Sequence, residues 1–254
     1  MGAARLPGGG APVLPGGTVL KTVCIHQPDF VPWPGFFQRL LNCDLFILLD
    51  DAQYEKNGWQ NRDRIKTAQG AKWISLPVAK GPLDQLIREV KLAPVPGWQD
   101  KLLNQVRESY RRAPHFEPFF VEFEDLLRSP HLHMADLNES LIRWLMGKYG
   151  IQVPLQRSSA FGVQQQKNER LIQLLKATGA TRYITGAGSR NYLDEGLFGQ
   201  HGIEVLWQSW TMPVHPQLHG PWIGMLSSLD ALFNIGPQLQ SWVRDHGAAR
   251  EERP

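Results

Sequence analysis

The pattern of apolar and polar positions is clearest near the start of the chain, where two apolar runs flank a short amphipathic segment. Residues 18–26 are β-branched and apolar apart from one lysine, which predicts a buried strand. Three prolines follow, and residues 35–43 then place apolar side chains on one helical face. The apolar run at 45–49 predicts a second strand, which ends at Asp50 and Asp51. Together these elements predict a right-handed βαβ unit.

The middle of the chain has a different pattern. Residues 54–80 alternate between polar and apolar positions on either side of Gln69 and Gly70, which predicts a β-hairpin. The residues that follow place apolar side chains every three or four positions, which is typical of amphipathic helices. We expect a helical insertion at about 96–148.

The rest of the chain repeats one order of elements: a helix, a glycine and a short apolar strand. Gly150, Gly179 and Gly202 each come just after a predicted helix, where glycine is a common C-terminal signal. Helices that alternate with apolar strands predict a mostly parallel sheet flanked by helices. We therefore predict an α/β fold into which the β-hairpin and the middle helices are inserted.

Composition sets the limits of this domain. Residues 1–17 are rich in Gly, Pro and Ala and are expected to form a disordered leader, residues 18–236 a single α/β catalytic domain, and residues 237–254 a polar tail. The formal charge of +3 allows a phosphate or nucleotide ligand without the charge density of a dedicated nucleic-acid binder. No apolar run approaches the ~20 residues of a membrane span. We expect a cytoplasmic protein with no membrane insertion.

Polar side chains at the predicted strand ends are the first candidates for chemistry, because ligands of open α/β sheets bind at the carboxyl ends of the strands. His26 ends the first strand, and Asp50 and Asp51 end the second. A carboxylate beside the imidazole would fix its tautomer and make His26 a catalytic base. Alternatively, the aspartates could bind Mg²⁺ or be one helix cap and one solvated charge, and His26 could merely cap a strand.

A second group of candidates would bind anions. Arg62, Arg64 and Lys66 share one face of an alternating strand, which could hold phosphate, although a solvated strand face has the same pattern. Gly186 and Gly188 follow another predicted strand, and their turn could offer backbone amides to an anion or be only a tight turn. The sequence contains no Walker motif and no clear set of metal ligands.

Several motifs around these candidates point to a known family. The opening motif is His26-Gln27-Pro28, followed by Pro32-Trp33-x-Gly35-Phe36-Phe37. The later motifs are Leu49-Asp50-Asp51-x-Gln53-Tyr54, Gln60-Asn61-Arg62-x-x-Ile65-Lys66, Lys167-x-Glu169-Arg170-Leu171, Gly186-Ala187-Gly188 with Tyr192-Leu193, and Leu226-Ser227-Ser228-Leu229-Asp230. From about residue 21 to 236 the chain resembles the WbqC-like family, which is bacterial and occurs in gene clusters for O-antigen lipopolysaccharide and other surface polysaccharides. Some members are suggested to transfer glycine onto an amino sugar.

The resemblance implies a transferase that moves an aminoacyl group, such as glycyl, to an amine of a nucleotide-linked sugar. His26, supported by Asp50 or Asp51, would remove the proton of the acceptor amine. An aminoacyl-tRNA is a candidate donor, and Mg²⁺ is a candidate cofactor. The candidate substrate-binding residues are Gln27, Trp33, Gly35, Gln60, Asn61, Arg62, Arg64, Lys66, Gly186, Gly188 and Tyr192.

A fainter resemblance is to HUP-type nucleotidyltransferases, which begin with a strand, a Pro-x-x-Gly loop that opens a helix, and a second strand. The corresponding residues here are Trp33-Pro34-Gly35-Phe36, so both histidines of the His-x-Gly-His motif of those enzymes are absent. The alternative function is therefore nucleotidyl transfer or acyl-adenylate formation with ATP and Mg²⁺. A non-catalytic partner that presents a nucleotide sugar is the third hypothesis.

Overall fold

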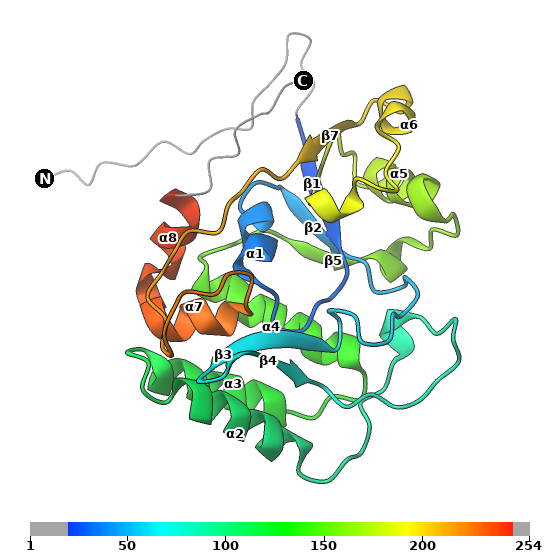
Figure 1. The fold of residues 1–254 in the computed structure, drawn as a ribbon. Helices are drawn as coiled ribbons and strands as arrows, with labels where there is room; N and C mark the ends of the chain where they lie inside the picture. The colour runs from blue at the N-terminus through cyan, green and yellow to red at the C-terminus, as the bar shows by residue number, and fades with distance from the viewer. Residues whose placement is uncertain (1–19, 246–254) are drawn as a thin grey trace, which may run out of the picture.

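The computed structural model describes residues 20–245, and its central element is a sheet of five parallel strands (Figure 1). The helices and strands are β1 (Thr22–His26), α1 (Pro34–Leu40), β2 (Leu45–Leu48), β3 (Arg62–Thr67), β4 (Gly70–Ser75), α2 (Trp98–Tyr110), α3 (Phe116–Arg128), α4 (Met134–Lys148), β5 (Leu155–Arg157), α5 (Lys167–Ala177), β6 (Arg182–Thr185), α6 (Glu195–Gln200), β7 (Glu204–Trp207), α7 (Ser228–Ile235) and α8 (Leu239–Asp245). Short 3-10 turns are η1 (Ile87–Glu89), η2 (Ser158–Phe161), η3 (Ala187–Ser189) and η4 (Gly236–Gln238). The predicted α/β class, with a mostly parallel sheet and a separate hairpin, is confirmed.

The order of the strands locates the place where a ligand would bind. Across the sheet the order is β5-β2-β1-β6-β7, and every neighbouring pair is parallel. The chain therefore winds outward from β1 in one direction and, after β5, returns to wind outward from β6 in the other. In doubly wound sheets ligands bind at such a switch point, beyond the carboxyl ends of the strands. Many doubly wound folds share this order, so the likeness to HUP-type enzymes stays a prediction.

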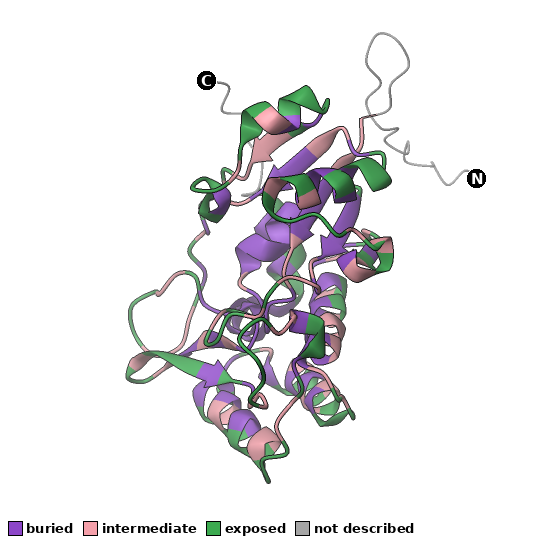
Figure 2. Cartoon of the chain, turned by 90° about the vertical axis from the view of Figure 1, so that its right-hand side faces the viewer, coloured by how far each residue is buried: buried purple, intermediate pink, exposed green. Residues whose placement is uncertain are grey.

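Both faces of the sheet are covered, which explains why the strands read as almost continuous apolar runs. In β1, Cys24 packs on one face with apolar side chains of α1, α4, α7 and α8. Its neighbours Val23 and Ile25 pack on the other face with side chains of α5 and α6. Figure 2 shows the central strands and α1 buried, while the outer sides of the surrounding helices are exposed.

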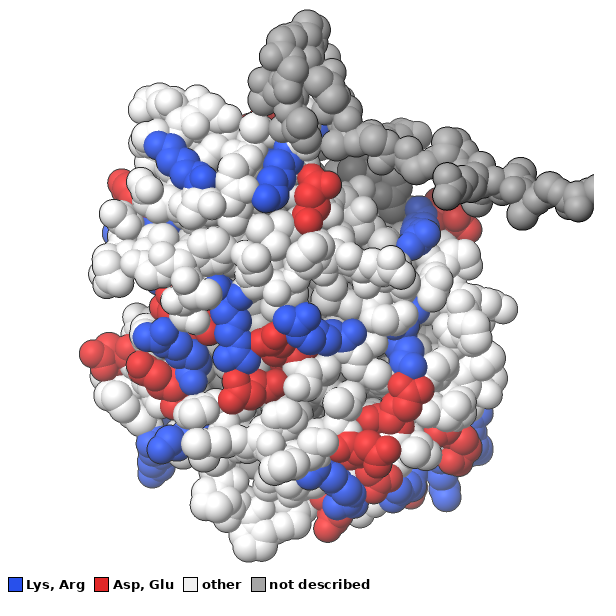
Figure 3. Space-filling view, turned by 180° about the vertical axis from the view of Figure 1, so that it is seen from behind, with Lys and Arg blue, Asp and Glu red and all other residues white. Residues whose placement is uncertain are grey.

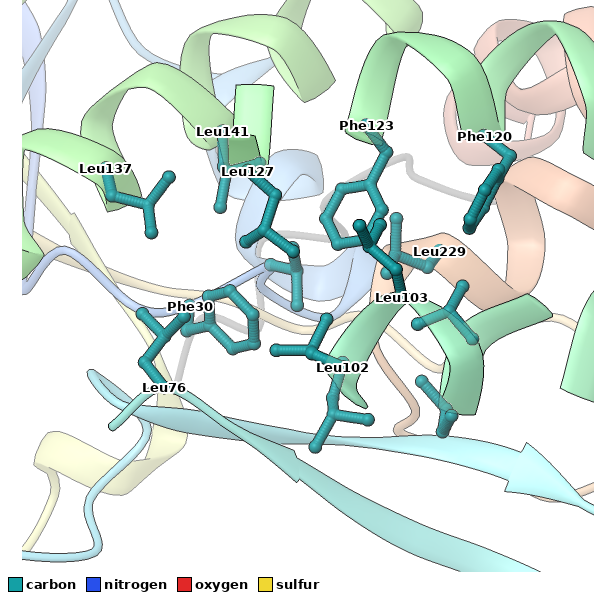
Figure 4. Packing of buried hydrophobic residues seen from close by; sticks show 14 of the residues in the cluster. Phe30, Leu76, Leu102, Leu103, Phe120, Phe123, Leu127, Leu137, Leu141 and Leu229 are labelled. Carbon is teal, nitrogen blue, oxygen red and sulfur yellow. The ribbon is translucent and has the colours of Figure 1, made fainter. Parts of the chain in front are cut away.

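The β-hairpin lies apart from this sheet and has a core of its own. Strands β3 and β4 are antiparallel, with Arg62 opposite Ser75 and Thr67 opposite Gly70. Their buried side chains pack on α2, α3 and α4, the helices of the expected insertion. Phe30, from the loop after β1, joins the same core (Figure 4) and so connects the hairpin region with the sheet.

The end of the described chain differs from the sequence prediction. A polar tail was expected over 237–254, but Leu239–Asp245 form the helix α8. Leu239 and Val243 are buried in the core beside α1. With the partly buried Trp242, they place three apolar residues at i, i+3 and i+4 on one turn, which is too short a pattern to stand out in a polar sequence. Residues 246–254 and the expected leader at 1–17 lie outside the described residues.

The face turned to the viewer in Figure 3 carries Lys and Arg side chains interspersed with Asp and Glu. Many surface charges of the described chain form ion pairs, as Arg128 does with Asp100 and Glu124. A surface of mixed sign does not create a strong field of one sign. Within residues 20–245, no helix combines the length and the apolar character that crossing a membrane requires.

Candidate functional site

A cavity of about 980 Å³ lies at the switch point, beyond the carboxyl ends of β1 and β6. Polar and aromatic residues from separate parts of the chain form its wall: His26, Gln27, Trp33, Arg39, Lys167, Arg170, Tyr183, Thr185, Gly186, Gly188, Ser189, Tyr192, Gln208 and Trp210. Among the candidate residues, His26, Gln27, Trp33, Gly186, Gly188 and Tyr192 therefore meet at one cavity. A second cavity of about 170 Å³ adjoins it, and His26, Trp33 and Met225 line both.

His26 stands where the two cavities meet. Its Nδ1 lies 3.1 Å from the Gln27 carbonyl oxygen, and its ring meets the Phe36 ring edge-on at 5.1 Å. When Nδ1 donates its proton to this carbonyl, Nε2 carries the lone pair. The side chain keeps 30% of its surface exposed. Burial, with the nearby Arg39 cation, lowers the pKa of His26 to about 3, so the ring is neutral at pH 7.

Asp29 supplies the carboxyl group beside this ring. Its Oδ2 lies 3.5 Å from Nδ1 of His26, and its side chain is 11% exposed. Burial raises the pKa of Asp29 to about 7, although Arg39 opposes the rise. Asp63 also lines the smaller cavity, and burial likewise holds the pKa of Asp63 well above its ordinary value. A carboxyl group that titrates near pH 7 beside an imidazole can donate or accept a proton at neutral pH.

The structure places Asp50 and Asp51 away from His26. The Asp50 carboxylate is buried and accepts hydrogen bonds from the Ser159 amide at 3.0 Å and the Ser159 hydroxyl at 2.8 Å. Asp51 accepts a hydrogen bond from Ser158 and pairs with Arg170. Both carboxylates thus fix the turn after β5, and neither lines the cavity. Within 20–245, no three His, Cys, Asp or Glu side chains are grouped as metal ligands.

The basic face expected on the hairpin does not gather around one ligand site. The Arg62 guanidinium lies 4.2 Å from the centre of the Trp73 ring, and Arg64 donates to the Met225 carbonyl at 3.2 Å. Lys66 is buried and donates to the carbonyls of Gly220 and Pro221 and to the Gln217 side chain. None of the three cations lines the large cavity.

The other candidate residues support the cavity wall from behind. Gln60 donates its amide to the Gln27 side chain and is buried, as is its neighbour Asn61. Gly35 accepts a hydrogen bond from Gln208 at 2.8 Å. A Cβ at Gly35 would overlap the Trp33 ring, so the glycine lets that indole fold back over the start of α1.

Sequence reasoning missed Asp29 and Arg39. Asp29 follows Pro28 in a loop, where a carboxylate is ordinarily solvated. Here Asn138 donates to the Pro28 carbonyl at 2.8 Å and holds the loop against α4. Arg39 lies between apolar residues of an expected amphipathic helix and was not singled out, but every residue of α1 is buried. The available signal was the shortness of this helix between two buried strands, which leaves it little solvent to face.

These features define a doubly wound α/β protein with a large cavity at its switch point. The model of the WbqC-like protein family matches residues 27–241, and the chain belongs to this family. It is 34% identical over 228 residues to the uncharacterized protein Rv1507c of Mycobacterium tuberculosis, across 89% of this chain and 98% of that one. No solved structure matches.

Proposed function

We propose that this protein is a transferase that moves an aminoacyl group, such as glycyl, to an amine of a nucleotide-linked sugar for a bacterial surface polysaccharide such as O-antigen. The observation that carries the proposal is His26, a neutral imidazole on the wall of the switch-point cavity whose Nδ1 faces the Gln27 carbonyl, so that Nε2 carries the lone pair. Family membership supports the class of pathway.

The chemistry requires a proton to leave the acceptor amine. As the amine nitrogen bonds to the acyl carbon of an activated ester, Nε2 of His26 would accept the proton and pass it to the departing oxygen. The carboxyl group of Asp29, 3.5 Å from Nδ1, would stabilise the ring when it becomes positive. An aminoacyl-tRNA fits the donor role, because it carries its acyl group as such an ester.

The shape and lining of the cavity support a substrate of this size. At about 980 Å³ it is as large as the cavities that enclose drug-sized ligands. The Trp33 and Trp210 rings lie 5.8 Å apart on its wall and would contact the apolar face of a sugar or base.

Mass spectrometry of nucleotide sugars incubated with the protein and candidate acyl donors tests the proposal. The expected product is heavier by the aminoacyl residue, and His26→Gln should lower its rate of formation by about 10²- to 10⁴-fold. The exposed His201 provides the control His201→Gln, which should retain full activity. A folded His26→Ala protein with full transfer activity would refute the assignment of the base. Tight binding of the nucleotide sugar without turnover would instead assign the non-catalytic role.

A further inference from the structure

Arg39 is a buried cation without an ion-pair or hydrogen-bonding side-chain partner among residues 20–245. It lies in α1, is 5% exposed and lines the large cavity. Among residues 20–245 its guanidinium forms no ion pair and no hydrogen bond, and its buried Nε has no partner. Its guanidinium lies 5.9 Å from the centre of the Phe36 ring, and its charge acts on the nearby His26 and Asp29.

Other arginines in this protein show what a structural role looks like. Arg157 pairs with Asp136 and Glu139, and Arg170, on the same cavity wall, pairs with Asp51. A buried cation without an ion-pair partner opposes folding, because it loses the solvation that water would give it. A side chain kept in this state is explained by a ligand that supplies the missing charge.

The cavity wall carries the positive charge that an anionic ligand requires. Its charged residues are Arg39, Lys167 and Arg170, and no Asp or Glu side chain lines it. Since Asp51 neutralises Arg170, two cations remain for a ligand. A Cβ at Gly186 would lie 2.7 Å from Nη1 of Arg39, so a side chain there would displace the guanidinium from its place at the end of β6.

We propose that Arg39 binds a phosphate group of the substrate and, with Lys167, makes this cavity a site for a diphosphate-bearing ligand. The planar guanidinium presents paired N–H donors that match two oxygens of a phosphate. Two unneutralised cations match a diphosphate better than a single carboxylate. The inference rests on the proposed function for the reaction, but the binding itself can be measured without turnover.

Binding at Arg39 would also change the base. The Arg39 cation lowers the pKa of His26, and a bound phosphate would offset that charge. The pKa of His26 would therefore rise when the ligand is present, and the ring would become a stronger base only in the complex. This dependence gives a readout that a purely structural arginine would not provide.

Calorimetric titration with inorganic pyrophosphate and with UDP tests the proposal, and acetate serves as the carboxylate comparison. We expect the wild-type protein to bind both phosphates more tightly than acetate. Arg39→Met should weaken phosphate binding about tenfold or more, and Arg39→Lys should weaken it less. The matched control is Arg62→Met on the hairpin, which should bind as the wild type does.

Thermal unfolding distinguishes a phosphate-binding role of Arg39 from a structural one. Without ligand, Arg39→Met should unfold at the same or a higher temperature, because it removes an uncompensated buried charge. Pyrophosphate should raise the unfolding temperature of the wild type and leave that of Arg39→Met unchanged. NMR titration should show the pKa of His26 rising in the variant, as it does in the wild type with pyrophosphate.

The outcomes distinguish this inference from the proposed function. Phosphate binding that depends on Arg39, without any transfer activity, would support Arg39 as a phosphate-binding residue and reject the proposed transferase activity. Full transfer activity in Arg39→Met would reject the role of Arg39 in phosphate binding and leave the proposed transferase activity intact. Absence of phosphate binding by the wild type, equal binding by Arg39→Met, or tighter binding of acetate would overturn the inference.

Discussion

The sheet cavity and the β-hairpin both contain buried or half-buried cations, but the partners of these cations differ. The Nε atoms of Arg62 and Arg64 are also buried without a hydrogen bond, so the difference lies in the rest of their contacts. On the hairpin, Lys66 is surrounded by oxygen acceptors and Arg62 lies over an indole. In the cavity, Arg39 has no polar partner among the described residues. A satisfied cation stabilises its own fold, whereas an unsatisfied one at a cavity points to a ligand. The basic residues that stand out in the sequence are therefore the structural ones.

The largest expected effect comes from removing the satisfied cation of the hairpin. Lys66→Met leaves the carbonyls of Gly220 and Pro221 and the Gln217 side chain without their donor. We expect a loss of about 3 kcal/mol in the free energy of unfolding, measured with urea. Lys72→Met, on the exposed side of the neighbouring strand, should change it by less than about 0.5 kcal/mol. Equal effects of the two substitutions would remove the contrast between the regions.

A second test concerns the acidic group of the cavity. The pKa of Asp29 is about 7 in the folded protein and 3.8 as the ordinary value, so the folded state holds the extra proton between these pH values. Stability should therefore fall as the pH rises from about 4 to 7. Asp29→Asn should remove this loss and raise the free energy of unfolding at pH 8 by about 2 kcal/mol. Asp84→Asn, at an exposed position, is the control. If Asp29→Asn gained less stability over the wild type at pH 8 than at pH 5, the raised pKa of Asp29 would be contradicted.

His26 should show the opposite dependence on pH. Its pKa is about 3 in the folded protein and 6.5 as the ordinary value, so the unfolded chain binds the proton first as the pH falls. The wild type should lose stability from about pH 6.5 downward, and His26→Gln should not. Because 30% of the side chain is exposed, we expect a gain of only about 1 kcal/mol at pH 4.5. Urea unfolding at pH 7 and at pH 4.5 measures this gain. An equal loss of stability in the wild type and in His26→Gln between these two pH values would show that burial does not lower the pKa of His26.

The smallest effect is expected at the surface of the hairpin. Arg62→Ala removes a guanidinium 4.2 Å from the centre of the Trp73 ring, whose residue is 40% exposed. Such a contact contributes about 0.5–1 kcal/mol, so the unfolding midpoint should move little. Transfer activity should stay unchanged. A large loss of activity would indicate that the ligand contacts the hairpin as well.

The sequence predicted the sheet well, because its strands are buried on both faces and its helices end in glycine. His26 and the turn at Gly186 were identifiable as well, since the switch-point rule selects the ends of strands. Asp29 and Arg39 could not be found in this way. Their roles depend on burial by Asn138 and the surrounding helices, which are distant along the chain. The bonds of Asp50 to Ser159 could not be foreseen, because they join residues more than a hundred positions apart.

The packing of α8 against α1 has a consequence for the timing of folding during synthesis. Phe37 and Leu40 of the helix that carries Arg39 share one core with Leu239 and Val243. About 200 residues separate these partners, so a ribosome needs roughly 10–40 s to make the second after the first. During that interval the nascent chain exposes the apolar faces of α1 that α8 will cover. The packing around the helix that carries Arg39 is therefore complete only after nearly the whole described chain has been synthesised.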